Sequence, residues 1–406
     1  MKKVMKNVMK RIMNGTVVGP DALYPDHQVL IRGSKILYIL PGSGPLPPVF
    51  SNNSVEVIDA EGGIITPGLI DIHSDYIEHM AAPRPTSLMD FTVAVRELER
   101  ELLSHGITTT FHSLSFFHSS VFPDKAIRRP ENTRKFVELI DEARKNKHLI
   151  HHRFHARFEI DCINRIEELE RYIREKKVHL LSFMDHSPGQ GQYGSLQEFR
   201  RAVKGFRGMM DKEIDVMIEE SKTKQKMTIA AISQLSRLAR ENGIAVASHD
   251  DDSPEKLELG LELGMDISEF PVNLATALRA REMNFHTVAG APNVLLGGSH
   301  TGNLSAAEAV QEGAVDILCS DYYPASLIHA VFLLHEQYGQ SLVDGFRLVT
   351  INPAKAVKID GLRGSIEPGK EADILIIKRL DDGFPAVNRA FVAGVESMTM
   401  QYRSNA

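Results

Sequence analysis

Short apolar runs of strand character alternate with longer amphipathic runs of helical character between residues 66 and 354. Eight strand-like runs can be distinguished, namely GLIDIH, ITTTFHS, LIHHRFHARFE, VHLLSFMD, IAVASH, DISEF, HTVAGAPNVLL and VDILCSD. Helical segments such as FTVAVRELERELLSHG and INRIEELERYIREKK separate most of them, and several segments end in Gly or Asn, as helices commonly do. Eight alternating strand–helix units predict an α/β fold, a (β/α)8 barrel of the TIM type.

The two ends of the chain have a different rhythm, with short strand-like runs and turns. Each end alone has too few strands to bury a stable core. We therefore expect one small β-sandwich domain, built from residues 1–65 and 355–406, beside a barrel formed by residues 66–354. A further helical stretch near residues 195–227 interrupts the barrel rhythm, and it is expected to form a lid or to contact a partner.

Composition argues against several classes of function. The formal net charge is −6 at pH 7, which argues against a general nucleic-acid-binding role. The sequence has no apolar run of about 20 residues, and its N-terminus lacks the unbroken apolar stretch that a signal peptide needs. Cys162 and Cys319 are the only cysteines, so no disulfide framework is expected. We expect a cytoplasmic protein that contacts neither nucleic acid nor membrane.

Metal-ligating residue types stand at the predicted strand ends, where TIM-type barrels place their chemistry. They are His73, Asp75, Glu159, His186, His249 and Asp321. His73 and Asp75 are two residues apart on a strand, so both side chains point the same way and can reach one ion. Singly, a strand-end histidine is more often structural, and Asp321 could cap the next helix. Together, three histidines and three carboxylates suit two divalent cations, with Glu159 as the bridge.

The third predicted strand, HHRFHARFE, alternates between polar and apolar residues from Arg153 onward. Its polar positions are His151, Arg153, His155, Arg157 and Glu159. Because the apolar face of a barrel strand packs on the surrounding helices, the polar face is expected to point inward. We expect four further histidines, His112, His118, His148 and His152, to be structural or surface residues.

Several motifs resemble those of a known family. TPGLIDIHSD is similar to the first-strand signature of the amidohydrolase superfamily, with Asp75 in place of the second histidine of the usual HxH. NPAKAVKIDGLRGSIEPGKEADILII resembles the segment with which those enzymes re-enter their small β domain. SFMDHSPGQGQY, GAPNVLLGGSHTGN and ILCSDYYPASLIHAVF resemble one branch, the hydrolases of the carbon–phosphorus lyase pathway, and the resemblance covers about residues 10–400.

The resemblance implies hydrolysis of α-D-ribose 1-methylphosphonate 5-triphosphate to the 5-phosphate and diphosphate in phosphonate catabolism. It implies two divalent metal ions, most simply zinc with manganese or iron as alternatives, held by the six residues named above. Asp321 would also take or orient the proton of the attacking water.

Further residues are candidates for contact with the phosphorylated small-molecule substrate. Arg84 and Arg157 can meet phosphate oxygens bidentately, and the backbone at Gly297 and Gly298 can approach an anion closely. The other two candidates are His300, as a metal-proximal or substrate group, and Tyr322, which could stack on a sugar.

Two alternatives remain at this point. The same metal site could hydrolyse a C–N bond in an amide, a cyclic amide or an amino-purine, because fold does not fix function. A non-catalytic scaffold is disfavoured, since such a protein would be expected to lose metal ligands and all six candidates are present.

We also expect a homo-oligomer, although the residues do not define its number of subunits.

Overall fold

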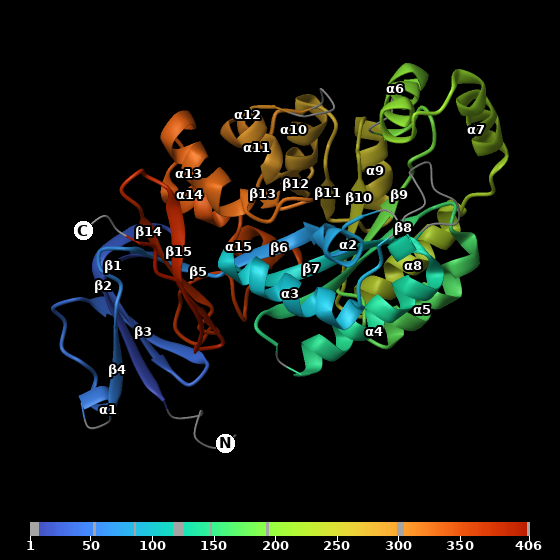
Figure 1. The fold of residues 1–406 in the computed structure, drawn as a ribbon. Coiled ribbons are helices and arrows are strands. Elements are labelled where there is room, and N and C mark those ends of the chain that lie inside the picture. Colours follow the sequence, from blue (N-terminus) through green and yellow to red (C-terminus); the bar gives the residue numbers. More distant parts are fainter. Residues whose placement is uncertain are drawn as a thin grey trace.

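The structure, a computed structural model, describes residues 8–51, 54–84, 87–116, 126–146, 148–191, 195–298 and 304–403. Figure 1 shows a strand-and-helix barrel beside a separate sheet that contains strands from both ends of the chain. Within the described residues, no helix is long and apolar enough to cross a membrane.

Eight parallel strands form the barrel sheet, in the order β13-β12-β11-β10-β9-β8-β7-β6. They are β6 (Leu69–Ser74), β7 (Ile107–Phe116), β8 (His151–Glu159), β9 (Leu180–Met184), β10 (Ala245–His249), β11 (Ile267–Glu269), β12 (His286–Gly290) and β13 (Ile317–Cys319). A bridge between Ser74 and Asp321 joins the end of β6 to the residues that follow β13. The predicted (β/α)8 barrel is therefore confirmed.

Helices cover the outside of this sheet (Figure 1). They are α2 (Tyr76–Ala81), α3 (Phe91–Ser104), α4 (Pro130–Asn146), α5 (Ile166–Arg174), α8 (Ile229–Glu241), α9 (Pro254–Glu262), α10 (Leu274–Glu282), α11 (Ala291–Leu296), α12 (Ala306–Gln311), α13 (Ser326–Tyr338), α14 (Leu342–Arg347) and α15 (Ile351–Ala356), with short 3-10 turns at η2 (Ala126–Arg128) and η3 (Ile163–Arg165). Side-chain caps start several of them: Asp90 accepts from the Val93 N–H and Ser253 from the Lys256 N–H.

The predicted strand HTVAGAPNVLL is only half strand. β12 ends at Gly290, and α11 begins at Ala291 with a proline in its first turn. Proline suits that position because its missing N–H would have no partner there in any case. The sharp change from strand to helix gives the seventh barrel strand the same strand-to-helix order as its neighbours.

The helical insertion forms a hairpin of α6 (Leu196–Arg207) and α7 (Asp211–Thr223). Its two helices bury a small core of their own, made by Phe199, Val203, Ile214 and Ile218. In Figure 1 the pair projects beyond the barrel near α9.

The second sheet contains both ends of the described chain, as expected. Its strands are β1 (Met9–Val18), β2 (Leu23–Arg32), β3 (Lys35–Pro41), β4 (Val55–Asp59), β5 (Ile64–Pro67), β14 (Ile374–Arg379), β15 (Pro385–Val392) and β16 (Val395–Thr399), with α1 (Pro48–Ser51) before β4. Their order is β16-β15-β14-β5-β1-β2-β3, and β4 pairs with β1 beside β5. The two ends meet where β5 pairs antiparallel with β14.

The small sheet continues directly into the barrel. β5 ends at Pro67 and β6 begins at Leu69, so only Gly68 lies between them. A side chain at Gly68 would collide with Thr108, because a Cβ there would lie 2.1 Å from the threonine Oγ1. Because a single residue joins the two sheets, the strands alone do not define where one domain ends and the other begins. The domain limits at residues 65 and 355 therefore stay predictions.

Candidate functional site

Three residues within two positions of the ends of barrel strands have a left-handed backbone. Asp250, Phe270 and Asp321 have φ angles of 53°, 56° and 54°. Such a conformation costs a residue with a side chain about 1–3 kcal/mol and is concentrated at functional sites. Backbone hydrogen bonds hold each turn in place: the Asp321 N–H, for example, donates to the His73 carbonyl at 3.0 Å. The strain marks the carboxyl ends of the strands as the candidate site.

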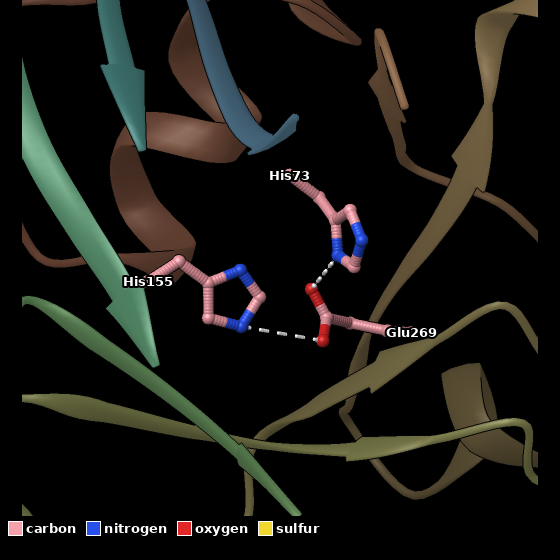
Figure 2. A group of neighbouring side chains, drawn as sticks. All are labelled: His73, His155 and Glu269. Atoms are coloured by element: carbon pink, nitrogen blue, oxygen red, sulfur yellow. Dashed lines mark hydrogen bonds and ion pairs between the residues drawn. The ribbon is translucent and has the colours of Figure 1, made fainter. Parts of the chain in front are cut away.

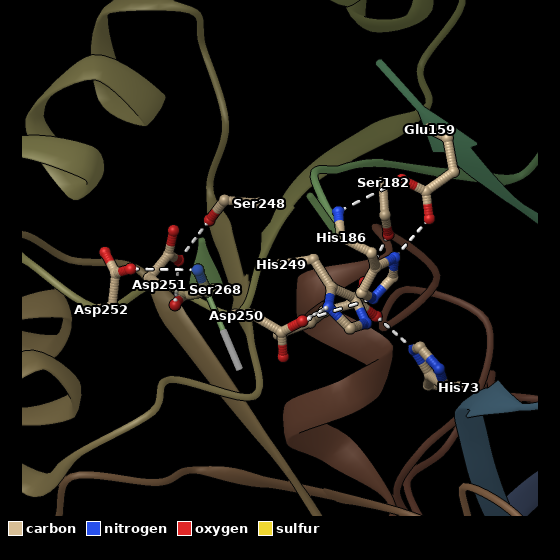
Figure 3. Close-up of polar contacts among 12 residues, drawn as sticks. His73, Glu159, Ser182, His186, Ser248, His249, Asp250, Asp251, Asp252 and Ser268 are labelled. Carbon is tan, nitrogen blue, oxygen red and sulfur yellow. Dashed lines mark hydrogen bonds and ion pairs between the residues drawn. The ribbon is translucent and has the colours of Figure 1, made fainter. Parts of the chain in front are cut away.

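One group at this edge consists of Glu159, His186, His249 and Asp250, all buried (Figure 3). His186 Nδ1 is hydrogen-bonded to Glu159, and its Nε2 lies 3.5 Å from Asp250 Oδ2. His249 Nδ1 lies 3.0 Å from the same oxygen. Burial opposes a charge on His186, yet the carboxylates of Glu159 and Asp250 outweigh it and raise the pKa of His186 to about 9.

A second group contains His73, His155 and Glu269, which are almost completely buried inside the barrel. Figure 2 shows both imidazoles beside the Glu269 carboxylate. His73 Nδ1 lies 2.9 Å from Glu269 Oε1, and His155 Nε2 lies 3.6 Å from Oε2. Burial lowers the pKa of His73 well below its usual value and that of His155 to about 3. Both histidines are therefore neutral at physiological pH.

The two groups adjoin at His249. Its ring centroid lies 5.7 Å from that of His73 and 5.8 Å from that of His186. The Phe270 ring packs against His73 and His249, with ring centroids 4.9 Å and 5.2 Å away. The buried histidines and carboxylates thus form one continuous site at the barrel mouth.

Asp75 and Asp321 lie where the barrel closes. The Asp75 N–H donates to the Asp321 carbonyl at 2.9 Å. Asp75 precedes α2, but its side chain makes no hydrogen bond to the first turn of that helix. Burial, reinforced by the negative charge of Asp75, raises the pKa of Asp321 to about 7. Two carboxylates so placed favour a cation between or beside them.

The donor set fits divalent metal ions. His73 Nε2 and His249 Nε2 are buried without a hydrogen-bond partner among the described residues, whereas His249 Nδ1 contacts the Asp250 carboxylate. Imidazole nitrogens and carboxylate oxygens are the ligands that zinc and related ions bind. Donor atoms from His186, His249 and Asp250 lie within 4.8 Å of one another, as do those of the His73 group. The residues present can therefore hold divalent ions.

The predicted substrate contacts differ in their placement. Arg157 lies on β8, half-buried, with its Nε enclosed and without a hydrogen-bond partner among the described residues. Arg84 is exposed on the segment after α2, and Tyr322 is 44% exposed beside Asp321. His300 and His118 fall outside the described residues.

The glycine pair Gly297 and Gly298 lies at the end of α11. The Gly297 N–H donates to the Val294 carbonyl at 3.3 Å, and the Gly298 N–H donates to the Asn293 carbonyl at 3.1 Å. Gly297, with a φ of 72°, therefore ends α11 as a helix cap. Both N–H groups are thus engaged within the chain, and the expected close approach of an anion to this backbone stays a prediction.

Sequence reasoning did not select Asp250, Glu269 or His155 as site residues. Asp250 and Glu269 carry the same signal as Glu159, a carboxylate at a strand end, and that signal could have found both. His155 was expected to face inward, and it does.

Two of the remaining histidines are buried in a hydrogen-bonded network outside the barrel. His112 Nε2 lies 2.8 Å from His152 Nδ1, and His152 Nε2 lies 3.1 Å from Glu99 Oε2. His148 adjoins the same carboxylate, with its Nδ1 3.5 Å from Glu99 Oε2.

Comparison with known proteins agrees with this architecture. The model of the amidohydrolase family matches residues 64–400. The chain is 34% identical over 335 residues to alpha-D-ribose 1-methylphosphonate 5-triphosphate diphosphatase of Escherichia coli (strain K12), covering 80% of this chain and 86% of that one. It is 25% identical over 366 residues to imidazolonepropionase of Treponema denticola, covering 82% of each. A solved structure, ochratoxinase of A. niger, matches with a TM-score of 0.65 at 12% identity, over 96% of this chain and 95% of that one.

Proposed function

The chain belongs to the amidohydrolase family and is a hydrolase, and on that premise we propose that it cleaves α-D-ribose 1-methylphosphonate 5-triphosphate to the 5-phosphate and diphosphate. The observation that carries this proposal is the 34% identity to the Escherichia coli diphosphatase, which extends over 80% of the chain. Such coverage is too long to be confined to one segment of the fold. It includes most of the barrel that presents the candidate site.

The proposal includes divalent metal ions at the barrel mouth. We propose His73, Asp75, Glu159, His186, His249 and Asp321 as the ligands, with Asp250 as a further candidate because its carboxylate reaches two of these histidines. Zinc is the simplest choice, and manganese and iron are alternatives. When bound, such ions supply Lewis acidity that polarises a phosphoryl oxygen.

The chain's own residues would bind the substrate and handle the proton. Asp321 stands at the closure of the barrel and is the proposed base for the attacking water. Arg157 offers a guanidinium in the barrel whose buried Nε has no hydrogen-bond partner in the described part of the chain, and this Nε can donate to a phosphate oxygen. Arg84, exposed at the rim, would meet the outer phosphates.

A second candidate function is hydrolysis of a C–N bond in an amide, a cyclic amide or an amino-purine. The similarity to an imidazolonepropionase, at 25% identity over 82% of both chains, favours it. The same buried histidines and carboxylates would serve this chemistry, because metal-bound sites polarise carbonyl and phosphoryl groups alike.

Product analysis separates the two functions. The metal-loaded protein is incubated with a ribosyl 5-triphosphate, and the products are followed by phosphorus NMR. Diphosphate as the first product supports the proposal, whereas orthophosphate as the first product refutes a diphosphatase. A protein that leaves the triphosphate intact and cleaves N-acyl amino acids or cyclic imides has the second function. Asp321→Asn serves as the inactive control for either reaction.

A further inference from the structure

We infer that Glu269 is a positioning residue: it fixes the tautomer of His73 so that Nε2 is presented to a metal ion, while His155 supports Glu269 and binds no metal. This inference rests on the metal site of the proposed function. It separates the six candidate ligands from a layer of buried residues beneath them, which has no assigned role.

The first argument is the hydrogen-bond chemistry of His73. An ionised carboxylate only accepts hydrogen bonds, so the contact of 2.9 Å to Glu269 Oε1 requires the hydrogen to be on Nδ1. A neutral imidazole carries one N–H, which leaves Nε2 as an acceptor. The opposite assignment would bury an Nε2–H without an acceptor, because this atom has no hydrogen-bond partner among the described residues. Such a group costs about 1–3 kcal/mol.

The second argument is a directed chain of hydrogen bonds that ends on the other oxygen of Glu269. The Ser74 N–H donates to Ser113 Oγ at 3.1 Å, and Ser113 Oγ lies 3.0 Å from His155 Nδ1. His155 Nε2 is hydrogen-bonded to Ser182 Oγ, and the Ser182 hydroxyl donates to Glu269 Oε2. One assignment satisfies every side-chain link. The Ser113 hydroxyl donates to His155 Nδ1, which is nearer than its other acceptor, the Phe111 carbonyl at 3.3 Å, and the Nε2–H donates to Ser182.

This assignment decides the role of His155. Its Nδ1 accepts from Ser113 and its Nε2 carries the hydrogen, so no nitrogen lone pair is left for a metal ion. His73, His155 and Glu269 have donor atoms within 4.8 Å of one another, as three ligands of one ion would. The hydrogen-bond directions instead leave a single free nitrogen lone pair in this trio, on His73 Nε2. The ring centroid of His73 lies 5.7 Å from that of His249, a proposed ligand.

The physical benefit is orientation. A carboxylate behind a metal-ligating histidine fixes its ring, selects its tautomer and raises its basicity, and loss of such a partner typically lowers metal affinity about 10- to 100-fold. Glu269 is fully buried and is held by Ser182 on the side opposite to His73. It can therefore hold His73 in one orientation before any ion arrives.

The test compares Glu269→Gln with the wild-type protein in metal affinity, in metal content at saturation and in the absorption spectrum of the Co²⁺-substituted protein. Glutamine keeps the shape but removes the charge. We expect zinc affinity to fall 10- to 100-fold, with full metal content at saturation and an unchanged Co²⁺ coordination number. His155→Gln should also retain full metal content at saturation.

A matched control is available in Glu99→Gln. Glu99 is 2% exposed and lies 3.1 Å from His152 Nε2, but this pair lies outside the barrel. The control should lose stability without losing zinc affinity, which distinguishes positioning from a general effect of a lost buried charge.

A direct readout is the nitrogen NMR spectrum of the metal-free protein labelled in histidine, assigned with His73→Gln. The Nδ1–H tautomer of His73 is expected in the wild type, with a mixture in Glu269→Gln. Four results would each overturn the inference. They are an Nε2–H tautomer of His73 in the wild type, equal zinc affinity of the wild type and Glu269→Gln, absence of zinc binding by the wild type, and loss of one metal equivalent at saturation in Glu269→Gln or His155→Gln. None of these measurements uses a substrate, so a wrong diphosphatase assignment would leave them unaffected.

Discussion

Asp373 connects the two parts of the molecule, and its replacement by asparagine should destabilise the whole protein. The residue precedes β14 and is 5% exposed. Its Oδ1 accepts from the Ala393 N–H at 2.7 Å and lies 3.1 Å from His151 Nε2 on β8. Its Oδ2 lies 3.5 Å from Arg363 Nε. One carboxylate thus contacts the small sheet through Ala393, a barrel strand through His151, and the segment between them through Arg363.

The magnitude follows from these contacts. Removal of one partner of a buried ion pair costs about 3–5 kcal/mol. Asparagine keeps an oxygen for the Ala393 N–H, so we place Asp373→Asn near the lower limit, at about 3 kcal/mol. The same replacement at Asp381, which is exposed on the loop after β14, is the control and should change stability by less than about 0.5 kcal/mol.

The pH dependence gives a sharper test. Burial alone would raise the pKa of Asp373, but His151 and Arg363 outweigh it and hold that pKa below its ordinary value. A carboxylate of this kind stabilises the fold above its unfolded pKa of about 4, and this stabilisation is lost as the pH falls through the lower folded value. The stability difference between wild type and Asp373→Asn should therefore be largest near neutral pH and shrink below about pH 4.

The assay is urea unfolding of wild type, Asp373→Asn and Asp381→Asn between about pH 3.5 and 7, followed by circular dichroism. If Asp373→Asn were as stable as wild type at pH 7, the contacts would not carry the energy assigned to them. If the difference stayed constant down to the lowest pH, the loss would come from packing and not from the charge.

The remaining predictions concern the candidate site and the chain ends. Arg157→Met should slow turnover about 10- to 100-fold, as expected for one lost charge-assisted contact. Arg84→Ala should have a smaller effect, because Arg84 is exposed. A larger effect of Arg84→Ala on kcat/KM would make Arg84 the more important substrate contact. Asp321→Asn should cost about 10²- to 10⁴-fold in kcat if it handles the proton, and near-normal turnover would exclude it as the base. Glu159→Gln should lower the metal content measured by elemental analysis if Glu159 bridges two ions, and unchanged content would remove it from the ligands. Deletion of residues 1–60 should unprotect β14 and β15 in hydrogen exchange, since β14 would lose the sheet that anchors its partner β5; retained protection there would contradict a shared sheet.

The barrel could be predicted because its eight strands and helices differ in hydrophobic period. The strand HTVAGAPNVLL was predicted too long, since a short apolar run does not by itself separate a buried strand from a buried helix. Pro292, in the first turn of α11, was the local signal for the change. The joining of the chain ends could be predicted because neither end could bury a core alone.

The order of the strands allowed only part of the site to be predicted, namely the residues at the strand ends. Parallel strands end at one edge, so His73, His186 and His249 could be placed together from their positions alone. The sequence could not show that Glu269 faces His73, because the two residues are 196 positions apart and meet only across the barrel. Likewise, the alternation along its strand could place Arg157 on the inward face, but only the fold shows that Arg84 is exposed.

The pairing of β5 with β14 also determines when, during synthesis, the small sheet can be completed. Ile65 emerges from the ribosome long before its partner Ile376. At about 5–20 residues per second, β5 waits roughly 15 to 60 seconds for the strand that covers it. During that time the nascent chain displays an open sheet edge, which is a site for unwanted strand pairing. The first strand of the barrel, separated from β5 by Gly68 alone, therefore depends for its final anchor on a strand that is made much later than the barrel itself.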